Sequence, residues 1–286
     1  MIPTLVDLTL PSPGFYNFIS SWIFEHKGLL FVVDPGPTNS LPILYGALGD
    51  REPDYILLTH IHVDHAGGIG ALSRKFPQAK IVAFEKAHRH LIDPSRLIEA
   101  SNKNVGTLMD LYGPIEAVGE SRILTNINEI EGLKVVHTPG HAPHHISFIF
   151  EDYIFCGEAL GISCPQDSGL YLRPASPPVF DLSSYLGSID KLESVYQGHK
   201  FCLGHYGMLE LGNEVFDVAR SQIALWKEIV GSYDFKDDKD VSEENYSAII
   251  DLIIRRDKYF EPYENLNKEL KEREKIFIKN SIRGLK

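Results

Sequence analysis

The chain has 286 residues, of which 43% are hydrophobic, enough to bury a large core in one domain or in one domain with an appendage. The formal net charge is −11, and it lies wholly in residues 1–235, because residues 236–286 carry 12 Lys or Arg and 12 Asp or Glu. An acidic body repels phosphate backbones, which argues against nucleic acid as a partner.

The sequence carries no signal for a membrane span or a leader segment. No stretch approaches the roughly 18–20 apolar residues that cross a bilayer, and the N-terminus lacks a basic region followed by an apolar run. Cys156, Cys164 and Cys202 form no spaced cluster, so we expect no disulfide and interpret each as a small packed hydrophobe. We therefore expect a cytoplasmic protein without a membrane partner.

The first half of the chain predicts short strands with helices between them. Two apolar runs joined by the tight Glu25–Gly28 connection indicate a hairpin. Asp93 and Pro94 predict the start of a helix that runs to about Tyr112, before Gly113-Pro114. The expected strands are Phe15–Phe24, Leu29–Val33, Tyr55–Leu58 and Lys80–Phe84, and a helical segment is expected over Ile69–Phe76.

The second half predicts another series of strands and then a helix. Apolar residues spaced for one buried face predict this helix over Asp181–Gln197. The proline-rich segment Gly169–Pro178 before it is expected to be an ordered loop that forms one wall of a pocket. The expected strands are Arg122–Asn128, Leu133–His137, Ile146–Phe150, Tyr153–Cys156 and Phe201–Leu203.

From Glu214 onward the pattern is helical, which suggests a catalytic domain over residues 1–235 and a helical extension over 236–286. The polar stretch Ser232–Asp240 resembles a linker, Ser242 can cap one helix, and another follows Pro262. The extension can pack on the body, cover the active site or mediate dimerisation. Its apolar stretch Ile249–Ile254 makes a homodimer a hypothesis.

The segment Thr59-His60-Ile61-His62-Val63-Asp64-His65 places three imidazoles and a carboxylate directly after an apolar strand. A loop there can fold back and direct these groups to one point. Imidazole nitrogen and carboxylate oxygen suit zinc, iron or manganese. The alternative is a surface loop that is rich in histidine by chance. We prefer a metal site, because the chain has only 12 histidines in 286 residues and three of them lie in this segment.

The chain offers more ligands than one tetrahedral ion needs. His141, Glu158 and His205 each follow a short apolar strand and lie beside a glycine. A single His or Glu at a strand end is more often solvated or hydrogen-bonded within a loop. Three of them in the same arrangement indicate additional ligands.

These residues resemble those of the metallo-β-lactamase superfamily, over roughly residues 15–210. The HxHxDH segment with later His, acid and His positions carries the resemblance. Thr138-Pro139-Gly140-His141 is similar to a segment of the glyoxalase II-like members, and Val33-Asp34-Pro35-Gly36 to the family's Asp-x-Gly turn. The resemblance implies an α/β fold, a four-layered αβ/βα sandwich with metals at one edge between two sheets.

Position by position, the family pattern implies two divalent metal ions, with zinc expected first and iron or manganese as alternatives. His60, His62 and His141 would bind one ion, and Asp64, His65 and His205 the other. Glu158 stands where the family usually has a bridging Asp, so the bridge must accommodate an extra methylene. Asp34 would support the site from outside the ligand set.

This ligand set predicts a hydrolase. Two ions about 3.5–4 Å apart lower the pKa of a shared water and polarise the substrate oxygen. Asp64 would be the catalytic residue that accepts or passes on the proton of that water, in addition to binding an ion.

Further residues are candidates for contacts around the metals. Tyr206 follows a ligand and can hydrogen-bond a substrate oxygen, although packing against the sheet explains it equally well. Arg173 can anchor a substrate carboxylate, although pairing with a local acid is the simpler reading. His145 is expected to donate a hydrogen bond to the ligand set. For His88, His90 and His144 we expect solvent or structural roles.

Three functions are compatible with the sequence. The acidic body and the TPGH segment favour hydrolysis of a small-molecule ester, thioester or lactone. An iron-dependent oxidoreductase acting on oxygen or a persulfide is the alternative, although the oxygen-reducing branch carries an acid where His62 stands. A metal-binding protein without catalysis would need a closed site, whereas glycines beside the ligands indicate open loops.

Overall fold

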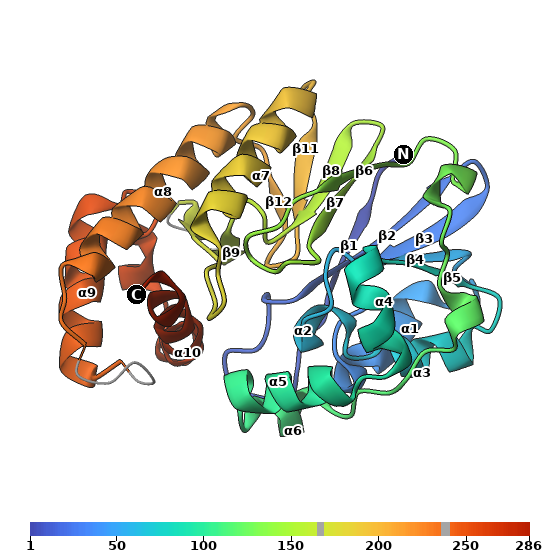
Figure 1. Cartoon of the computed structure of the whole chain (residues 1–286), viewed down its shortest axis with the longest axis horizontal. Coiled ribbons are helices and arrows are strands. Elements are labelled where there is room, and N and C mark those ends of the chain that lie inside the picture. The colour runs from blue at the N-terminus through green and yellow to red at the C-terminus, as the bar shows by residue number, and fades with distance from the viewer. Residues whose placement is uncertain (165–168, 236–240) are drawn as a thin grey trace.

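The computed structural model describes residues 1–164, 169–235 and 241–286, and it contains two β-sheets that face each other. Helices cover the outer face of each sheet, so the layers follow the order helix, sheet, sheet, helix (Figure 1). The expected αβ/βα sandwich is therefore confirmed, and the C-terminal residues form helices as expected.

The first sheet has the order β1-β2-β3-β4-β5. Its strands are β1 (Thr4–Asp7), β2 (Ser20–His26), β3 (Leu29–Val33), β4 (Tyr55–Leu57) and β5 (Lys80–Val82). β2 and β3 form the expected hairpin, whose turn residues Lys27 and Gly28 both have positive φ, 51° and 78°, as tight turns between twisted strands require. β3, β4 and β5 are parallel, so their carboxyl ends lie at one edge of the sheet.

Short helices connect and cover this sheet. The α-helices are α1 (Leu41–Leu48), α2 (Val63–Ala66), α3 (Ile69–Lys75), α4 (Glu85–Ile92), α5 (Ser95–Val105) and α6 (Leu108–Tyr112). The 3-10 helices of this half are η1 (Thr38–Ser40), η2 (Glu120–Arg122) and η3 (Ile127–Glu129).

The second sheet has the order β12-β11-β8-β7-β6. Its strands are β6 (Lys134–His137), β7 (Ile146–Phe150), β8 (Tyr153–Gly157), β11 (Lys200–Leu203) and β12 (Met208–Leu209), and a separate hairpin consists of β9 (Ile162–Cys164) and β10 (Tyr171–Arg173). The helices of this half are α7 (Leu182–Val195), α8 (Glu214–Gly231), α9 (Glu243–Arg256), η4 (Glu261–Asn265) and α10 (Lys268–Leu285).

Alternating side chains of each strand build separate cores. Along β2, Trp22 and Phe24 face the second sheet and pack with Phe148 and Phe155. Ile23 points to the opposite face, toward the helices of the first half. This period of two is what a strand buried on both faces requires. It produces one core between the sheets and one under each helical layer.

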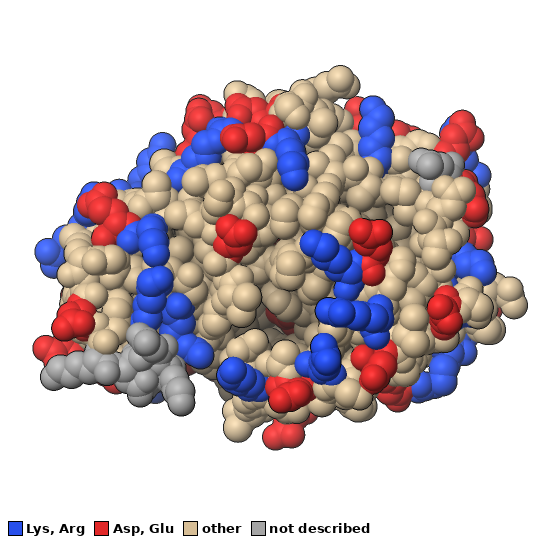
Figure 2. All heavy atoms as spheres, viewed as in Figure 1, with Lys and Arg blue, Asp and Glu red and all other residues tan. Residues whose placement is uncertain are grey.

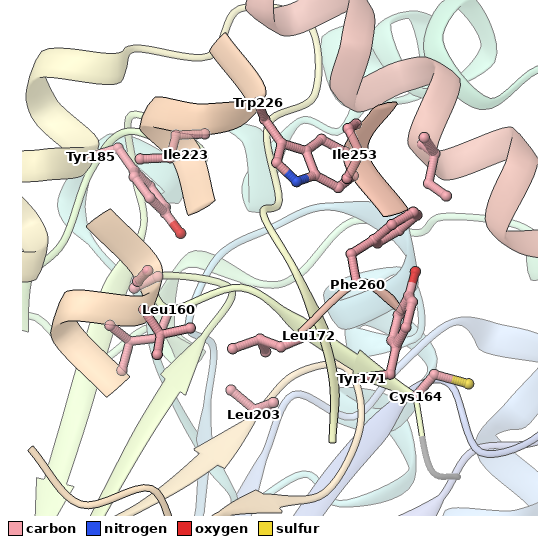
Figure 3. Packing of buried hydrophobic residues seen from close by; sticks show 14 of the residues in the cluster. Leu160, Cys164, Tyr171, Leu172, Tyr185, Leu203, Ile223, Trp226, Ile253 and Phe260 are labelled. Carbon is pink, nitrogen blue, oxygen red and sulfur yellow. The ribbon is translucent and has the colours of Figure 1, made fainter. Parts of the chain in front are cut away.

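The C-terminal helices share the core of the second sheet. Trp226 on α8, Ile253 on α9 and Phe260 lie close together in Figure 3, with the rings of Trp226 and Phe260 5.2 Å apart. Ile249, Ile250 and Ile253 are buried in the same cluster. The apolar stretch that suggested a dimer surface is thus largely covered within the chain, and dimerisation stays a prediction.

Two expected elements begin or end elsewhere. The strand expected over Phe15–Phe24 starts only at Ser20, because the chain turns at Asn17, whose φ is 46°. The helix expected from Asp93 to Tyr112 is split into α5 and α6 at Gly106, whose φ is 54°.

Two further expectations were wrong about the type of structure. The strand expected over Arg122–Asn128 is absent apart from a single bridge from Ile123 to Ile81, between two 3-10 turns. The loop expected over Gly169–Pro178 contains strand β10. The expected linker Ser232–Asp240 includes residues 236–240, which lie outside the described residues. Among the described residues, no helix has the length and apolar character needed to cross a membrane.

Candidate metal centre

The ends of four strands bring the potential ligands to one edge of the sandwich. The segment after β4 and the short helix α2 supply four of them, and the segments after β6, β8 and β11 supply one each. β8 and β11 are parallel neighbours, so their carboxyl ends lie side by side. The set is His60, His62, Asp64, His65, His141, Glu158 and His205.

The first group of potential ligands consists of His60, His62, His141 and Glu158, whose ligand atoms all lie within 4.8 Å of one another. His141 Nε2 lies 2.9 Å from His62 Nδ1 and 2.6 Å from Glu158 Oε2. His60 Nε2 lies 3.3 Å from the same carboxylate oxygen. Three imidazole nitrogens and one carboxylate therefore surround a single point.

The second group consists of Asp64, His65 and His205. The Nε2 atoms of His65 and His205 face each other at 3.1 Å, and Asp64 Oδ2 lies 3.2 Å from His205 Nε2. Glu158 lies between the two groups, since its Oε1 is 3.7 Å from His205 Nε2 and its Oε2 is 3.8 Å from His65 Nε2. Its longer side chain thus reaches both sets of imidazoles.

Hydrogen bonds on the outer ring nitrogens fix the orientation of the imidazoles. His141 Nδ1 lies 3.1 Å from the carbonyl oxygen of Ala175, and His205 Nδ1 lies 2.9 Å from that of Phe18. Each ring therefore donates its Nδ1 proton outward and presents an unprotonated Nε2 inward, which is the tautomer that binds a metal.

Asp34 supports the segment that carries the histidines. Its two carboxylate oxygens accept hydrogen bonds from the backbone N–H of Thr59 at 2.8 Å and from the Thr59 hydroxyl at 2.6 Å. Its Oδ2 also lies 3.4 Å from His65 Nδ1. The backbone φ of Asp34 is 50°, a conformation that costs energy outside glycine and that surrounding contacts must hold.

His145 contacts the backbone of Glu158 rather than the ligand atoms. The N–H of Glu158 donates to His145 Nε2 at 3.2 Å, so His145 carries its proton on Nδ1 and donates to the Thr138 hydroxyl at 2.8 Å. A Cβ atom at Gly157 would lie 2.5 Å from His145 Nε2, and the φ of Gly157 is 52°. Only glycine therefore fits before Glu158.

Burial and close charges shift the pKa values of these groups in opposite directions. Burial and the neighbouring His141 lower the pKa of His62 to about 4. Burial disfavours the protonated form of His65, but the charges of Asp64 and Asp34 outweigh burial and raise the pKa of His65 to about 9. Burial likewise disfavours ionised Asp64, but His65 and His205 lower its pKa to about 2.

The residues present fit divalent metal ions. His60 Nε2 is buried without a hydrogen-bond partner, although it points at the first group. Ligands of a tetrahedral zinc lie about 2.0–2.2 Å from the ion, which puts them about 3.4 Å from one another. Close pairs of atoms within the two groups are 2.6–3.8 Å apart, so a positive ion in each group would balance otherwise unfavourable contacts.

The two expected substrate contacts have different surroundings. Arg173 is fully buried and its Nε donates to Glu274 of α10 at 2.6 Å, while its Nη2 has no hydrogen-bond partner. It nevertheless lines the cavity beside the ligands. Tyr206 is half-buried, and it does not belong to the described lining of that cavity.

A cavity of about 320 Å³ opens beside the ligands. Figure 2 shows a hollow near the centre of this face, with acidic side-chain atoms at its floor and Lys or Arg side chains along its lower rim. Its lining includes Leu97 and Ala100 of α5 and Phe277 of α10. Sequence reasoning missed these residues, because no motif marks them and only their apolar spacing along helices could have drawn attention to them.

Comparisons with known proteins agree with this geometry. The family model described as metallo-beta-lactamase superfamily matches residues 15–199. A metallo-beta-lactamase fold-containing protein of Sulfurisphaera tokodaii is 29% identical over 191 residues, which are 62% of this chain and 69% of that protein. A hydroxyacylglutathione hydrolase of Xylella fastidiosa is 29% identical over 218 residues, 76% of this chain and 70% of that protein.

A solved structure of an archaeal metallo-beta-lactamase superfamily protein from Sulfolobus tokodaii superposes with a TM-score of 0.64 at 20% identity, over 99% of this chain and 97% of that one. It therefore has the same arrangement of sheets and helices, including the C-terminal part. Since the family model also covers well over half of the chain, the protein belongs to the metallo-β-lactamase superfamily.

Proposed function

We propose that the protein is a hydrolase that uses two divalent ions, zinc by preference, to cleave a small ester, thioester or lactone. The observation that carries this proposal is the pair of ligand groups with Glu158 between them. Both groups face the cavity, since His62, Asp64, His141, Glu158 and His205 all line it.

Each group of potential ligands would bind one ion. His60, His62 and His141 would hold one ion, Asp64, His65 and His205 would hold the other, and Glu158 would lie between them. When bound, two such ions lower the pKa of a shared water and polarise a substrate carbonyl. The hydrogen bonds to Ala175 and Phe18 keep the imidazoles aimed inward throughout.

Asp64 is the residue that orients the attacking water. Its Oδ2 lies 3.2 Å from His205 Nε2 and 3.8 Å from His65 Nε2, and its side chain is among the lining of the cavity. Its pKa near 2 keeps it ionised at neutral pH, so it can accept a hydrogen bond from an attacking water and orient that water for attack. Arg173 remains a proposed substrate contact through its Nη2, which has no hydrogen-bond partner, whereas Tyr206 is not part of the described cavity lining.

The experiment that tests the proposal pairs metal analysis with substrate assays. Elemental analysis of protein purified without chelator is expected to give about two zinc or manganese ions per chain, with hydrolysis of aryl esters, thioesters or lactones. His141→Ala should lose metal and activity, whereas His199→Ala, a histidine outside both ligand groups, should lose neither. Bound iron with oxygen consumption and no hydrolysis would contradict the proposal and favour an oxidoreductase.

A further inference from the structure

The walls of the cavity differ from its floor. The floor includes the metal-ligand candidates, whereas α5, α10 and the loop after β10 supply much of the walls. The apolar residues of these helices are Leu97, Ala100 and Val105 of α5 and Phe277 of α10, and the polar residues beside them are Arg96, Ser101 and Asn104 of α5 and Asn280 and Ser281 of α10. Figure 1 shows α10 to the left of α5, and both helices contribute to the lining of the cavity. The loop after β10 adds Ala175, Pro177 and Pro178.

The walls offer few charged partners. Apart from the proposed ligands Asp64 and Glu158, the charged side chains in the described lining are Arg96 and Arg173. Arg173 is already paired with Glu274, which is buried and also accepts from Tyr171 and Arg273. Among the described residues, the lining therefore holds no carboxylate outside the ligand groups that could pair with a positive charge on a substrate.

A glutathione thioester finds partners for only part of its charge in such walls. Its two carboxylates could face Arg96 and Arg173, but its ammonium group would leave water without a carboxylate partner in the described lining. Apolar walls instead stabilise an apolar group by roughly 0.8 kcal/mol for each methylene they bury, which corresponds to about a fourfold gain in binding.

We infer that the substrate carries an apolar alkyl or aryl arm next to its scissile carbonyl, and that this arm lies between α5 and α10. The inference rests on the proposed function and adds the substrate class. The carbonyl faces the ligand groups, the arm contacts Leu97 and Phe277, and the C-terminal helix is part of the specificity of the site.

The test uses two series of substrates with the zinc-loaded protein. One series varies the acyl chain from two to ten carbons with a constant p-nitrophenol leaving group, and the other varies an alkyl alcohol or thiol with a constant acetyl group. In at least one series, kcat/KM is expected to rise about threefold to fourfold per methylene until the cavity is full. An S-acyl glutathione of equal acyl length should gain nothing over an acyl thioester of a simple thiol.

Two substitutions in α5 test where the apolar arm of the substrate binds. Ala100→Phe fills the opening and is expected to shorten the chain-length optimum by several methylenes, with little change for acetyl esters. Asn102→Phe adds the same ring on the same helix outside the described lining and should leave the profile unchanged. A profile that is flat in both series, or that both variants alter equally, overturns the inference.

Binding measurements test for the same apolar site if no substrate is hydrolysed. Calorimetry of the zinc-loaded protein with alcohols from butanol to decanol is expected to give tighter binding with each methylene, and Ala100→Phe should limit this gain to the shorter alcohols. Chain-length-dependent binding without any hydrolysis would reject the proposed hydrolase and keep the apolar arm. Hydrolysis without any chain-length dependence would support the proposed hydrolase and reject the apolar arm.

Discussion

At the scale of single residues, the site depends on groups that do not themselves face the cavity. Asp34 fixes Thr59 through both the backbone and the hydroxyl and lies close to His65. Such outer partners of metal ligands commonly change metal affinity by about 10–100-fold when removed. The potential ligands were predicted from their spacing, and Asp34 from its position after an early strand.

Asp34→Asn is expected to weaken binding of the second ion by about 10–100-fold. The amide keeps the size of the side chain but loses the charge beside His65 and one of its two acceptor oxygens. A competition titration with a zinc-binding dye measures the loss. Asp54→Asn, which alters a carboxylate that accepts the Leu30 N–H away from the ligands, should leave zinc affinity unchanged.

Glu274 is the residue whose charge ties α10 to the body. Burial disfavours its charge, but Arg173 and Arg273 outweigh this and lower its pKa to about 2. Because the folded-state pKa lies below the ordinary value, the stabilisation is complete above about pH 4.5 and is lost as the pH falls toward 2.

Glu274→Gln is therefore expected to lower the free energy of unfolding by about 3 kcal/mol at neutral pH, because two buried guanidinium groups lose their carboxylate. Denaturant unfolding at pH 7, 5 and 3.5 measures it. The difference between the parent chain and the variant should shrink at the lowest pH. A difference that stays constant or grows with acid would contradict the assigned pKa.

At the scale of elements, α10 packs against Phe18, and Phe18 in turn contacts His205 of the second group of potential ligands. The Phe18 ring lies 4.3 Å from the ring of His205, and its carbonyl oxygen accepts the His205 Nδ1 hydrogen bond. From α10, the Arg273 guanidinium lies 4.3 Å from the Phe18 ring and the Phe277 ring lies 4.9 Å from it. The position of His205 thus depends on a helix that begins more than sixty residues later.

Phe277→Leu is expected to lower the affinity for the second ion several-fold and to leave the affinity for the first ion unchanged. The reason is that Phe18 loses a ring contact that holds its carbonyl in place. Ile278→Val is the matched control, since Ile278 is the next residue of α10 and is buried in the core of the second half. Both variants should lose some thermal stability. Stepwise metal titration separates them, and equal effects on the second ion would rule out a positioning role for α10.

At the scale of the whole molecule, the last helices belong to the core of the second half. Ile249 and Ile253 of α9 and Ile278 and Ile282 of α10 are buried with residues of β8, β11 and α8. A Cβ atom at Gly284 would lie 2.2 Å from the carbonyl oxygen of Ser176, so α10 also packs closely against the loop after β10.

A chain that ends after Gly231 is expected to aggregate or unfold rather than to yield a smaller active domain. Removing α9 and α10 exposes the apolar face of α8 and leaves the Arg173 charge buried without Glu274. Circular dichroism and sedimentation of the shortened and full chains check this. A shortened chain that melts cooperatively near the temperature of the full chain would show that residues 1–231 fold independently.

Local patterns determined the parts of the fold that depend on neighbouring residues. β3 and β7 have the expected bounds, because a short run of apolar side chains buries well only as a strand. Sequence reasoning failed where an apolar run is buried in another way. Phe15 and Phe18 are as buried as strand residues, but they belong to a loop whose turn at Asn17 is not encoded by its apolar pattern.

The sequence by itself determined the family and the set of potential metal ligands, because the ligand chemistry requires particular side chains at fixed spacing after strand ends. Only the tertiary structure decided what surrounds that set. The pairing of Arg173 with Glu274, the contact of α10 with Phe18 and the apolar walls from α5 and α10 join segments distant along the chain. Such contacts depend on how whole layers pack, and no local spacing records them.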